Sequence, residues 1–245
     1  MISPITTGIY AGLGLAACAG AAAGVYAYAS MWPGSRLFGE ALTAPSRPGE
    51  LALTFDDGPN ATWTPKLLDI LASHQVRATF FLLGERAKVT PDLVKRTAAA
   101  GHIIGNHSWN HPNLARSSPE VIQEQLRRTQ DTLEQITGKA VKFFRPPYGA
   151  RRPAVFRIAR EMELNPVLWN AMVPDWSDPS PRRITERLTD KIERLRMRGL
   201  AANIVLHDGG HDDPAANRLA SVTAAERLIE RYKGAHHFVT LDAWV

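Results

Sequence analysis

The chain has 245 residues, of which 44% are hydrophobic and 22% are charged, a balance typical of a globular domain with an ordinary core. Its formal net charge of +5 suits an anionic partner, but no basic block with interleaved aromatic residues is present, which argues against a nucleic-acid-binding protein. The single cysteine, Cys18, lies near the N-terminus. This excludes a disulfide framework and leaves His and carboxylate side chains to bind any metal in the rest of the chain.

The N-terminal segment is apolar, since residues 8–29 carry no charge and consist mainly of Ala, Gly and Leu. A helix of that length can span a bilayer, so residues 1–31 are predicted to be a signal anchor or a signal peptide. Cleavage would follow Ala27-Tyr28-Ala29, which fits the small-x-small pattern of a signal peptide. Two other interpretations stay open: a lipoprotein signal at Leu15–Cys18, and a buried Ala/Gly-rich helix.

Residues 32–49 contain several Pro and Gly residues with little hydrophobic periodicity, which predicts a linker. From residue 50 onward, short apolar runs alternate with helical segments. The predicted strands are Leu51–Phe55, Ala78–Leu83, His102–Gly105, Val141–Phe144, Pro166–Trp169, Asn203–Leu206 and Phe238–Leu241. About seven strand–helix units predict an α/β fold with a parallel sheet covered by helices, either closed into a barrel or open.

Helix starts are marked where a capping residue precedes a proline at the first helical position. These pairs are Thr64-Pro65, Thr90-Pro91, Ser118-Pro119, Ser180-Pro181 and Asp213-Pro214. No Gly-rich phosphate-binding turn follows the first strand, which argues against a nucleotide-binding open sheet. In a barrel and in an open sheet alike, active residues belong at the carboxyl ends of the strands.

Polar residues gather at those strand ends. They are Asp56-Asp57 after the first strand, His107 to His111 after the third, Arg145 to Gly149 after the fourth, Asp175 to Ser177 after the fifth and His207 to Gly209 after the sixth. Because the carboxyl ends of parallel strands lie at the same edge of the sheet, we expect these residues on one rim.

The two histidines of the second block, His107 and His111, point to a metal when they are joined to the acid pair. Pro112 disfavours a helix at His111, so a tight turn is expected to present both rings. Two imidazoles and one carboxylate form a three-ligand set with an open position, the pattern of catalytic zinc. One aspartate of the pair can bind the cation while the other faces a water molecule, and the cation offsets their mutual repulsion. The alternative is a doubled Asx turn that caps the next segment.

Several other polar residues are assigned to structure rather than function. His211-Asp212-Asp213 is predicted to be a solvated loop, with Asp213 as a cap, rather than a second metal site. His74 and His102 are predicted at the surface or at a strand edge. Arg151-Arg152 is predicted to be a solvated helix start rather than a substrate contact.

The five polar blocks, in this order, resemble the polysaccharide deacetylase family (carbohydrate esterase family four). The matching segments are TFDDG at Thr54–Gly58, HSWNH at His107–His111, RPPYG at Arg145–Gly149, DWS at Asp175–Ser177 and LHDG at Leu206–Gly209. The resemblance covers residues 50–245, which would form the catalytic domain. It implies a distorted (β/α) barrel and a metal-dependent hydrolase that removes acetyl groups, usually from N-acetylglucosamine polymers.

The resemblance also implies where the metal binds and which side chain activates the water. Asp57, His107 and His111 would bind the metal, commonly Zn²⁺, with Co²⁺ as another divalent ion that fits. Asp56 would be the general base, and Arg145 would hold and tune it.

The remaining roles also come from the resemblance. His207 would be the general acid, and Asp175 would orient it. The backbone N–H of Tyr148 would help to bind the oxyanion, while Trp176 and Leu206 would shape the pocket around the acetyl methyl group.

The expected partners are a glycan substrate and, through the N-terminal segment, a membrane; no protein partner is inferred. Peptidoglycan or a related cell-surface glycan comes first among the substrates, and chitin-type oligomers come second. Alternatives are acetylated xylan, a small non-sugar amide, or a catalytically silent, metal-stabilised glycan-binding module.

A polymer substrate favours a membrane-anchored or secreted protein with an extracytoplasmic catalytic domain. Arg36 is the positive residue nearest to the apolar segment, and the positive-inside rule taken literally would place its side in the cytoplasm. We favour the extracytoplasmic location, because a spanning segment has little purpose for a cytoplasmic small-molecule enzyme.

Overall fold

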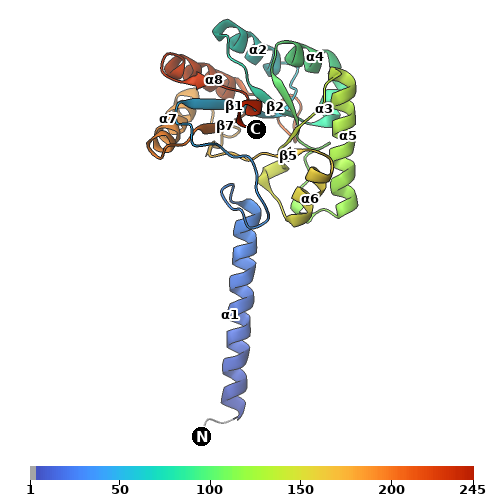
Figure 1. The fold of residues 1–245 in the computed structure, drawn as a ribbon, viewed down its shortest axis with the longest axis vertical. Helices are drawn as coiled ribbons and strands as arrows, with labels where there is room; N and C mark the ends of the chain where they lie inside the picture. Colours follow the sequence, from blue (N-terminus) through green and yellow to red (C-terminus); the bar gives the residue numbers. More distant parts are fainter. Residues whose placement is uncertain (1–3) are drawn as a thin grey trace.

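A computed structural model describes residues 4–245, with side chains from Cys18 onward. The first element, α1 (Pro4–Met31), is a long helix that projects from an α/β domain as a separate rod (Figure 1). Its side chains from Cys18 to Tyr28 are exposed, so the interpretation as a buried helix is wrong for this part. In the described part of the chain, no helix combines the length and the apolar character needed to cross a bilayer. The side chains of residues 15–17, on which the lipoprotein interpretation depends, lie outside the described ones.

The domain contains one parallel sheet, as the alternating pattern predicted. The strand order is β5-β4-β3-β2-β1-β7-β6, and β8 pairs with the start of β1. The strands are β1 (Glu50–Gly58), β2 (Thr79–Leu82), β3 (Ile103–Asn106), β4 (Phe143–Phe144), β5 (Asn165–Pro166), β6 (Ala171–Met172), β7 (Ala202–His207) and β8 (His237–Phe238). Each predicted run overlaps one of these strands, and only the short β6 was not predicted.

Helices surround the sheet in Figure 1, and the predicted distorted (β/α) barrel is confirmed, in the form of a curled half-barrel of parallel strands. The helices are α2 (Trp63–His74), α3 (Gly84–Val89), α4 (Pro91–Ala99), α5 (Pro119–Thr137), α6 (Pro153–Glu161), α7 (Pro181–Met197) and α8 (Leu219–Tyr232). Short 3₁₀ turns are η1 (Leu114–Arg116), η2 (Pro147–Gly149) and η3 (Leu241–Trp244). The sheet's apolar residues pack against the inner faces of these helices to form the main core.

The helix-start chemistry was predicted with mixed success. Ser118 and Ser180 each accept a hydrogen bond from a backbone N–H three residues later, at 3.4 and 3.3 Å, so both caps are confirmed. Asp213-Pro214 starts no helix, because α8 begins at Leu219; that prediction is wrong. Its Oδ1 instead accepts from the N–H of Ala215 at 2.8 Å and closes a local turn.

The sheet does not close into a full barrel, since β5 and β6 form its two edges. Leu42, from the predicted linker, pairs beside the β5 edge. Its N–H donates to the carbonyl of Pro166, and its carbonyl accepts from Leu168, both at 2.9 Å. The segment that precedes β1 is thus held against the sheet at this point.

His102 was predicted at the surface or at a strand edge; it directly precedes β3 and is buried, with 7% of its surface exposed, so only the surface alternative is wrong. Its Nδ1 accepts a hydrogen bond from the N–H of Ala78 at 3.1 Å, and its ring packs against Phe80. Burial, helped by the positive charge of Arg77, lowers the pKa of His102 from 6.5 to about 4. The side chain is therefore a neutral core residue whose acceptor nitrogen satisfies a backbone donor.

The buried neutral His102 is expected to make the free energy of unfolding depend on pH. Its contribution is fully present above the unfolded pKa of 6.5 and is lost as the pH falls through 6.5 toward 4. The whole shift corresponds to about 3 kcal/mol. His102→Gln keeps an acceptor but cannot titrate, so it should reduce the fall in stability between about pH 7 and pH 4, measured by urea unfolding. His74→Gln is the matched control, and an equal pH dependence in wild type and His102→Gln would contradict the assignment.

Candidate active site

A distortion at the end of β1 explains how two adjacent carboxylates enter one site. The strand continues to Gly58, whereas the sequence predicted its end at Phe55, and its register with β2 shifts between Asp56 and Gly58. Asp57 at the shift has a left-handed backbone with φ of 68°. Because a bulge turns a side chain away from simple alternation, Asp56 and Asp57 are both buried beside His107, with carboxylate-to-Nε2 distances of 4.0 and 3.4 Å.

The structure brings the three predicted metal ligands together. Oδ1 of Asp57 lies 3.4 Å from Nε2 of His107 and 3.3 Å from Nε2 of His111. These ligand atoms all lie within 4.8 Å of one another, and all three residues are buried. Oδ1 of Asp57 has no hydrogen-bond partner among the described residues, so the orphaned carboxylate oxygen fits a bound cation.

Hydrogen bonding and protonation prepare these side chains for a cation. Nδ1 of His107 donates to the backbone carbonyl of Arg145 at 2.8 Å, which directs the Nε2 lone pair toward Asp57. Burial alone would raise the pKa of Asp57, but its contacts with His107 and His211 hold it well below 3.8. Burial and the nearby His107 lower the pKa of His111 to about 3. A charged carboxylate and a neutral imidazole are the forms that bind metals.

Asp56 is paired with a fully buried arginine. Nη1 of Arg145 donates to Oδ1 of Asp56 at 2.7 Å and to Oγ1 of Thr54 at 2.8 Å. The guanidinium also lies over the ring of Phe81, with Cζ 4.1 Å from the ring centroid. These contacts fix one oxygen of Asp56 and leave Oδ2 on the side of His107.

His207 and Asp175 form the second acid–base pair of the site. Nδ1 of His207 lies 2.8 Å from Oδ1 of Asp175, whose Oδ2 accepts from the His207 N–H at 2.9 Å and from Oγ of Ser221 at 2.6 Å. Burial alone would lower the pKa of His207, but the carboxylate of Asp175, with Asp57 and Asp56, raises it to about 9. His207 is therefore a cation near neutral pH.

Within residues 4–245, six non-glycine residues have a positive φ, and four of them belong to this site. They are Asp57, Ser108, His111 and Tyr148, with φ values of 68°, 70°, 63° and 59°. Such backbone conformations are costly for these residue types and persist only where the surroundings hold them. The strained backbone conformations therefore lie within the candidate site, where side chains and backbone groups converge.

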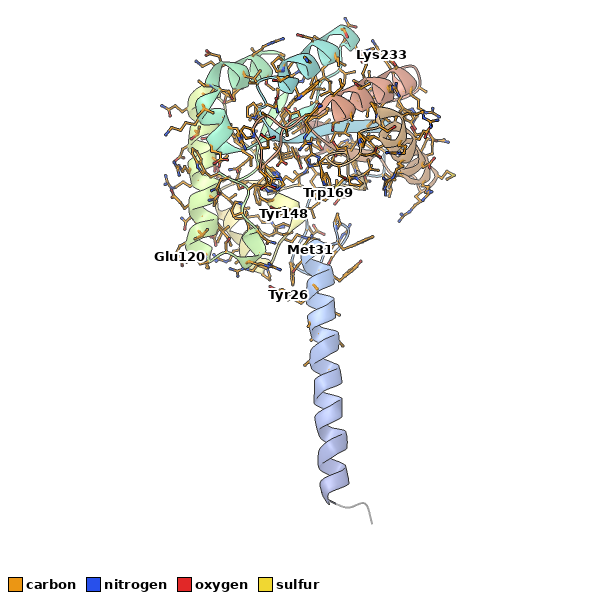
Figure 2. The ribbon with its side chains drawn as sticks, turned by 180° about the vertical axis from the view of Figure 1, so that it is seen from behind. Tyr26, Met31, Glu120, Tyr148, Trp169 and Lys233 are labelled. Atoms are coloured by element: carbon orange, nitrogen blue, oxygen red, sulfur yellow. The ribbon has the colours of Figure 1, made fainter. Side chains whose placement is uncertain are left out.

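Tyr148 lies in η2, and its ring contacts His111 at a centroid distance of 4.5 Å. Its backbone N–H donates to no acceptor within residues 4–245, which leaves that donor available to a ligand. The side chain is 47% exposed, on the face of the domain from which α1 projects (Figure 2).

The two residues predicted to surround the acetyl methyl group differ in exposure. Trp176 is 47% exposed, and its ring lies edge-on to His207 at 5.1 Å. Leu206 lies in β7, opposite Phe55 of β1, and is fully buried in the main core. Their roles toward the acetyl group stay predictions.

Asp208 of the LHDG block is a buried acid that the sequence interpretation did not use. Its Oδ2 accepts a hydrogen bond from the hydroxyl of Thr64, and burial raises the pKa of Asp208 to about 7. A Cβ placed on Gly58 would come within 2.6 Å of Oδ2 of Asp208. This contact explains why glycine follows the acid pair of β1.

His211 was predicted to be part of a solvated loop, and this prediction is wrong. Its Nδ1 lies 3.2 Å from Oδ2 of Asp57, and its ring stacks on His111 at 4.1 Å. The contact with Asp57 raises the pKa of His211. His211 thus binds the carboxylate oxygen of Asp57 that faces away from His107 and His111, the position of an outer partner that orients a metal ligand.

We expect His211→Phe to weaken zinc binding by about 10-fold or more, because it keeps the ring stacked on His111 but removes the hydrogen bond to Asp57. The zinc Kd is to be measured by competition with a chelating dye, which does not depend on turnover. Asp213→Asn on the same loop is the matched control. An unchanged Kd in His211→Phe would show that Asp57 needs no such partner.

Comparison with known proteins agrees with this geometry. A family model described as polysaccharide deacetylase matches residues 43–167. A peptidoglycan-N-acetylglucosamine deacetylase of Bacillus cereus is 38% identical over 205 residues, which cover 83% of this chain and 70% of that protein. A chitooligosaccharide deacetylase of Azorhizobium caulinodans is 35% identical over 181 residues, covering 74% and 83% of the two chains.

Solved structures share the fold. A peptidoglycan N-acetylglucosamine deacetylase in complex with 4-naphthalen-1-yl-N-oxidanyl-benzamide is 37% identical with a TM-score of 0.71, covering 83% of this chain and 91% of that one. A pseudoenzyme of the same esterase family from Bacillus anthracis is 26% identical with a TM-score of 0.74, covering 83% and 68%. The match over half of the chain, and the identity to relatives over most of it, establish that this protein belongs to the polysaccharide deacetylase family.

Proposed function

We propose that this protein is a metal-dependent hydrolase that removes N-acetyl groups from an amino-sugar polymer. The observation that carries the proposal is the Asp57–His107–His111 cluster, with Asp56–Arg145 and His207–Asp175 on the same rim of the sheet. Amide hydrolysis needs electrophilic assistance, a base for water and an acid for the amine. Each of the three groups supplies one of these needs.

Zn²⁺ is the cation that the ligand set favours, since two imidazoles and one carboxylate leave one position open. When bound, zinc supplies Lewis acidity that polarises an acetyl carbonyl and makes a neighbouring water easier to deprotonate. Co²⁺ suits the same nitrogen and oxygen donors. Asp57, His107 and His111 would hold the ion through Oδ1 and the two Nε2 atoms.

Asp56 takes the proton from the attacking water. Arg145 fixes its Oδ1, so Oδ2 is the oxygen that remains for the water. Because the guanidinium is buried and rigidly held, the base is positioned before the substrate arrives.

The amine of the sugar is a poor leaving group until it is protonated. His207 is cationic near neutral pH and holds that proton on Nε2, since Nδ1–H is bonded to Asp175. The free N–H of Tyr148 stabilises the oxyanion that forms when water adds to the carbonyl. Trp176, beside His207, covers the acetyl methyl group.

The names of the relatives support an amino-sugar substrate, since they describe peptidoglycan and chitooligosaccharide deacetylases. We place the catalytic domain outside the cytoplasm, where such polymers are, with α1 as its attachment or its export signal. Protease treatment of intact cells tests the location, and a fully protected domain would overturn it.

The test of activity is acetate release by the purified full-length chain. The substrates are an N-acetylglucosamine oligomer, peptidoglycan and acetylated xylan, each with a chelator and with added zinc. We expect release from an amino-sugar substrate that the chelator abolishes and zinc restores. Release from xylan alone would overturn N-deacetylation in favour of ester hydrolysis. No release with zinc bound would make the chain a silent relative, like the pseudoenzyme that shares its fold.

A further inference from the structure

Arg151, two residues after the RPPYG block, is fully buried although it was predicted to be solvated. Its guanidinium donates to backbone carbonyls: Nη1 to Gly149 at 3.0 Å and to Ser30 at 3.4 Å, and Nη2 to Trp32 at 2.5 Å and to Ser35 at 3.3 Å. The N–H of Arg151 adds a bond to the carbonyl of Ser30 at 3.0 Å. Three of the four acceptor residues come from the end of α1 and the turn that follows it.

The acceptors suit a positive charge. The last carbonyls of a helix lack partners within the helix and carry its partial negative charge, and Ser30 lies in the last turn of α1. Charge-assisted bonds to several carbonyls satisfy the two Nη atoms of this guanidinium, while its buried Nε has no hydrogen-bond partner among the described residues. Burial lowers the pKa of Arg151. Ala29 and Ser30 are themselves buried, at 1% and 7% exposure, so the end of α1 is packed rather than merely tethered.

The fourth acceptor connects this contact to the active site. Gly149 follows Tyr148, and both have a positive φ, 59° at Tyr148 and 65° at Gly149. Such a pair of left-handed residues needs support from its surroundings. Trp169 supports one side, since a Cβ on Gly149 would lie 2.8 Å from its ring, and Arg151 supports the other by bonding the Gly149 carbonyl.

The same N-terminal segment also borders the open surface beside Tyr148. A cleft of about 1160 Å³ is lined in part by residues 31–36, Tyr148 and Trp169. In Figure 2, Tyr148 and Trp169 lie close to Met31, where α1 meets the domain. The end of α1 and the Tyr148 loop thus form one continuous surface.

We propose that Arg151 is a positioning residue that couples the segment Ala29–Ser35 to the Tyr148 loop. The coupling holds the Tyr148 N–H in the orientation that stabilises the oxyanion. The catalytic unit therefore begins at the end of α1 rather than at β1. This inference rests on the proposed function, because it gives the Tyr148 N–H a catalytic role.

The experiment compares full-length variants from both sides of the contact. Arg151→Met removes the donors, and Ala29→Glu displaces the buried end of α1 without changing the catalytic domain. Arg152→Met and Ala27→Glu are matched controls: the side chain of Arg152 donates to the carbonyl of Ser117, outside the segment Ala29–Ser35, and Ala27 is exposed. We expect kcat to fall by about 10- to 100-fold in both test variants, with KM and zinc content nearly unchanged.

Two further variants separate positioning from a general loss of structure. Arg151→Lys, which keeps the charge and fewer donors, should retain an intermediate kcat. The double variant Ala29→Glu/Arg151→Met should lose no more activity than either single variant, because both break the same contact. A wild-type kcat in folded Arg151→Met, a rise in KM alone, or full additivity would overturn the proposal. If Arg151→Met does not fold, Ala29→Glu and Arg151→Lys decide by the same criteria.

Hydrogen exchange gives a readout that does not need turnover. The amides of Gly149 and Ala150, which donate to the carbonyls of Pro146 and Pro147 at 2.9 Å, should exchange faster in Arg151→Met and Ala29→Glu than in the wild type and the two controls. Unchanged exchange would overturn the coupling even if no substrate were hydrolysed. An inactive wild type with the expected exchange pattern would instead overturn the proposed function alone.

Discussion

Replacing Asp56 by Asn is expected to lower kcat by about 10³-fold while the bound zinc remains at one equivalent. The variant keeps a carbonyl oxygen that Arg145 can bond, but it loses the carboxylate that takes the proton of water. The three predicted zinc ligands are untouched, since Asp57, His107 and His111 converge on other atoms. Acetate release and metal analysis on the same sample check both halves of the expectation.

The matched control for this variant is Asp57→Asn, which should lose zinc and activity together. The Asp56 variant also leaves Arg145 buried without an opposite charge, so a fall in melting temperature is expected. Assays must therefore be made where unfolding curves show a folded protein. Activity near the wild-type level in folded Asp56→Asn would end its assignment as the general base.

Asp175→Asn is expected to lower kcat by about 10²- to 10³-fold near neutral pH. It should also move the alkaline limb of the pH–rate profile toward lower pH. Asp175 is the main cause of the raised pKa of His207, which is about 9. A general acid works in its protonated form, so activity falls as the pH rises through that pKa. Without the carboxylate of Asp175, only the more distant Asp57 and Asp56 oppose the effect of burial, so the limb moves toward lower pH, by about one unit or more.

Ser221→Ala provides the control for that shift. It removes the 2.6 Å bond to Oδ2 of Asp175 but leaves the negative charge beside His207. We expect its alkaline limb to stay within about half a unit of the wild type. If the alkaline limb of the pH–rate profile does not move in Asp175→Asn, a group other than His207 protonates the amine.

The gathering of polar residues at one rim of the sheet was predictable, because it depends on the local alternation of apolar runs and polar blocks in the sequence. Apolar runs mark the buried strands, and parallel strands point their carboxyl ends to the same edge. The polar blocks at the carboxyl ends of β1, β3, β4 and β7 could therefore be predicted to lie together. The short β6, with two residues, carried too little pattern to be found.

The backbone of the site was not predictable. Asp57, Ser108, His111 and Tyr148 adopt left-handed conformations that local preference assigns to Gly or Asn. Contacts distant in sequence impose them, such as the close approach of Gly209 to the carbonyl of Asp57. At these residues, tertiary contacts around the site override the local backbone preference of the residue type.

His211 and Arg151 were predicted to be solvated, and the structure shows that both predictions are wrong for a second reason. Charged and polar loop residues are mostly solvated, so that interpretation was the natural one. Their partners lie 154 and 121 residues away, at Asp57 and Ser30, and no local pattern announces such acceptors. A buried guanidinium is tolerated only when tertiary structure supplies several carbonyls at once.

The order of the site residues along the chain divides the reaction into two halves. The groups proposed to bind the acetyl carbonyl and to activate the water all lie between Asp56 and Tyr148, inside the matched region 43–167. The pair proposed to protonate the leaving amine, Asp175 and His207, lies beyond that region. A homologue can therefore keep every recognisable motif of the first half and still be unable to finish the reaction. Whether a member of this family turns over should be judged first from the residues that follow the matched region.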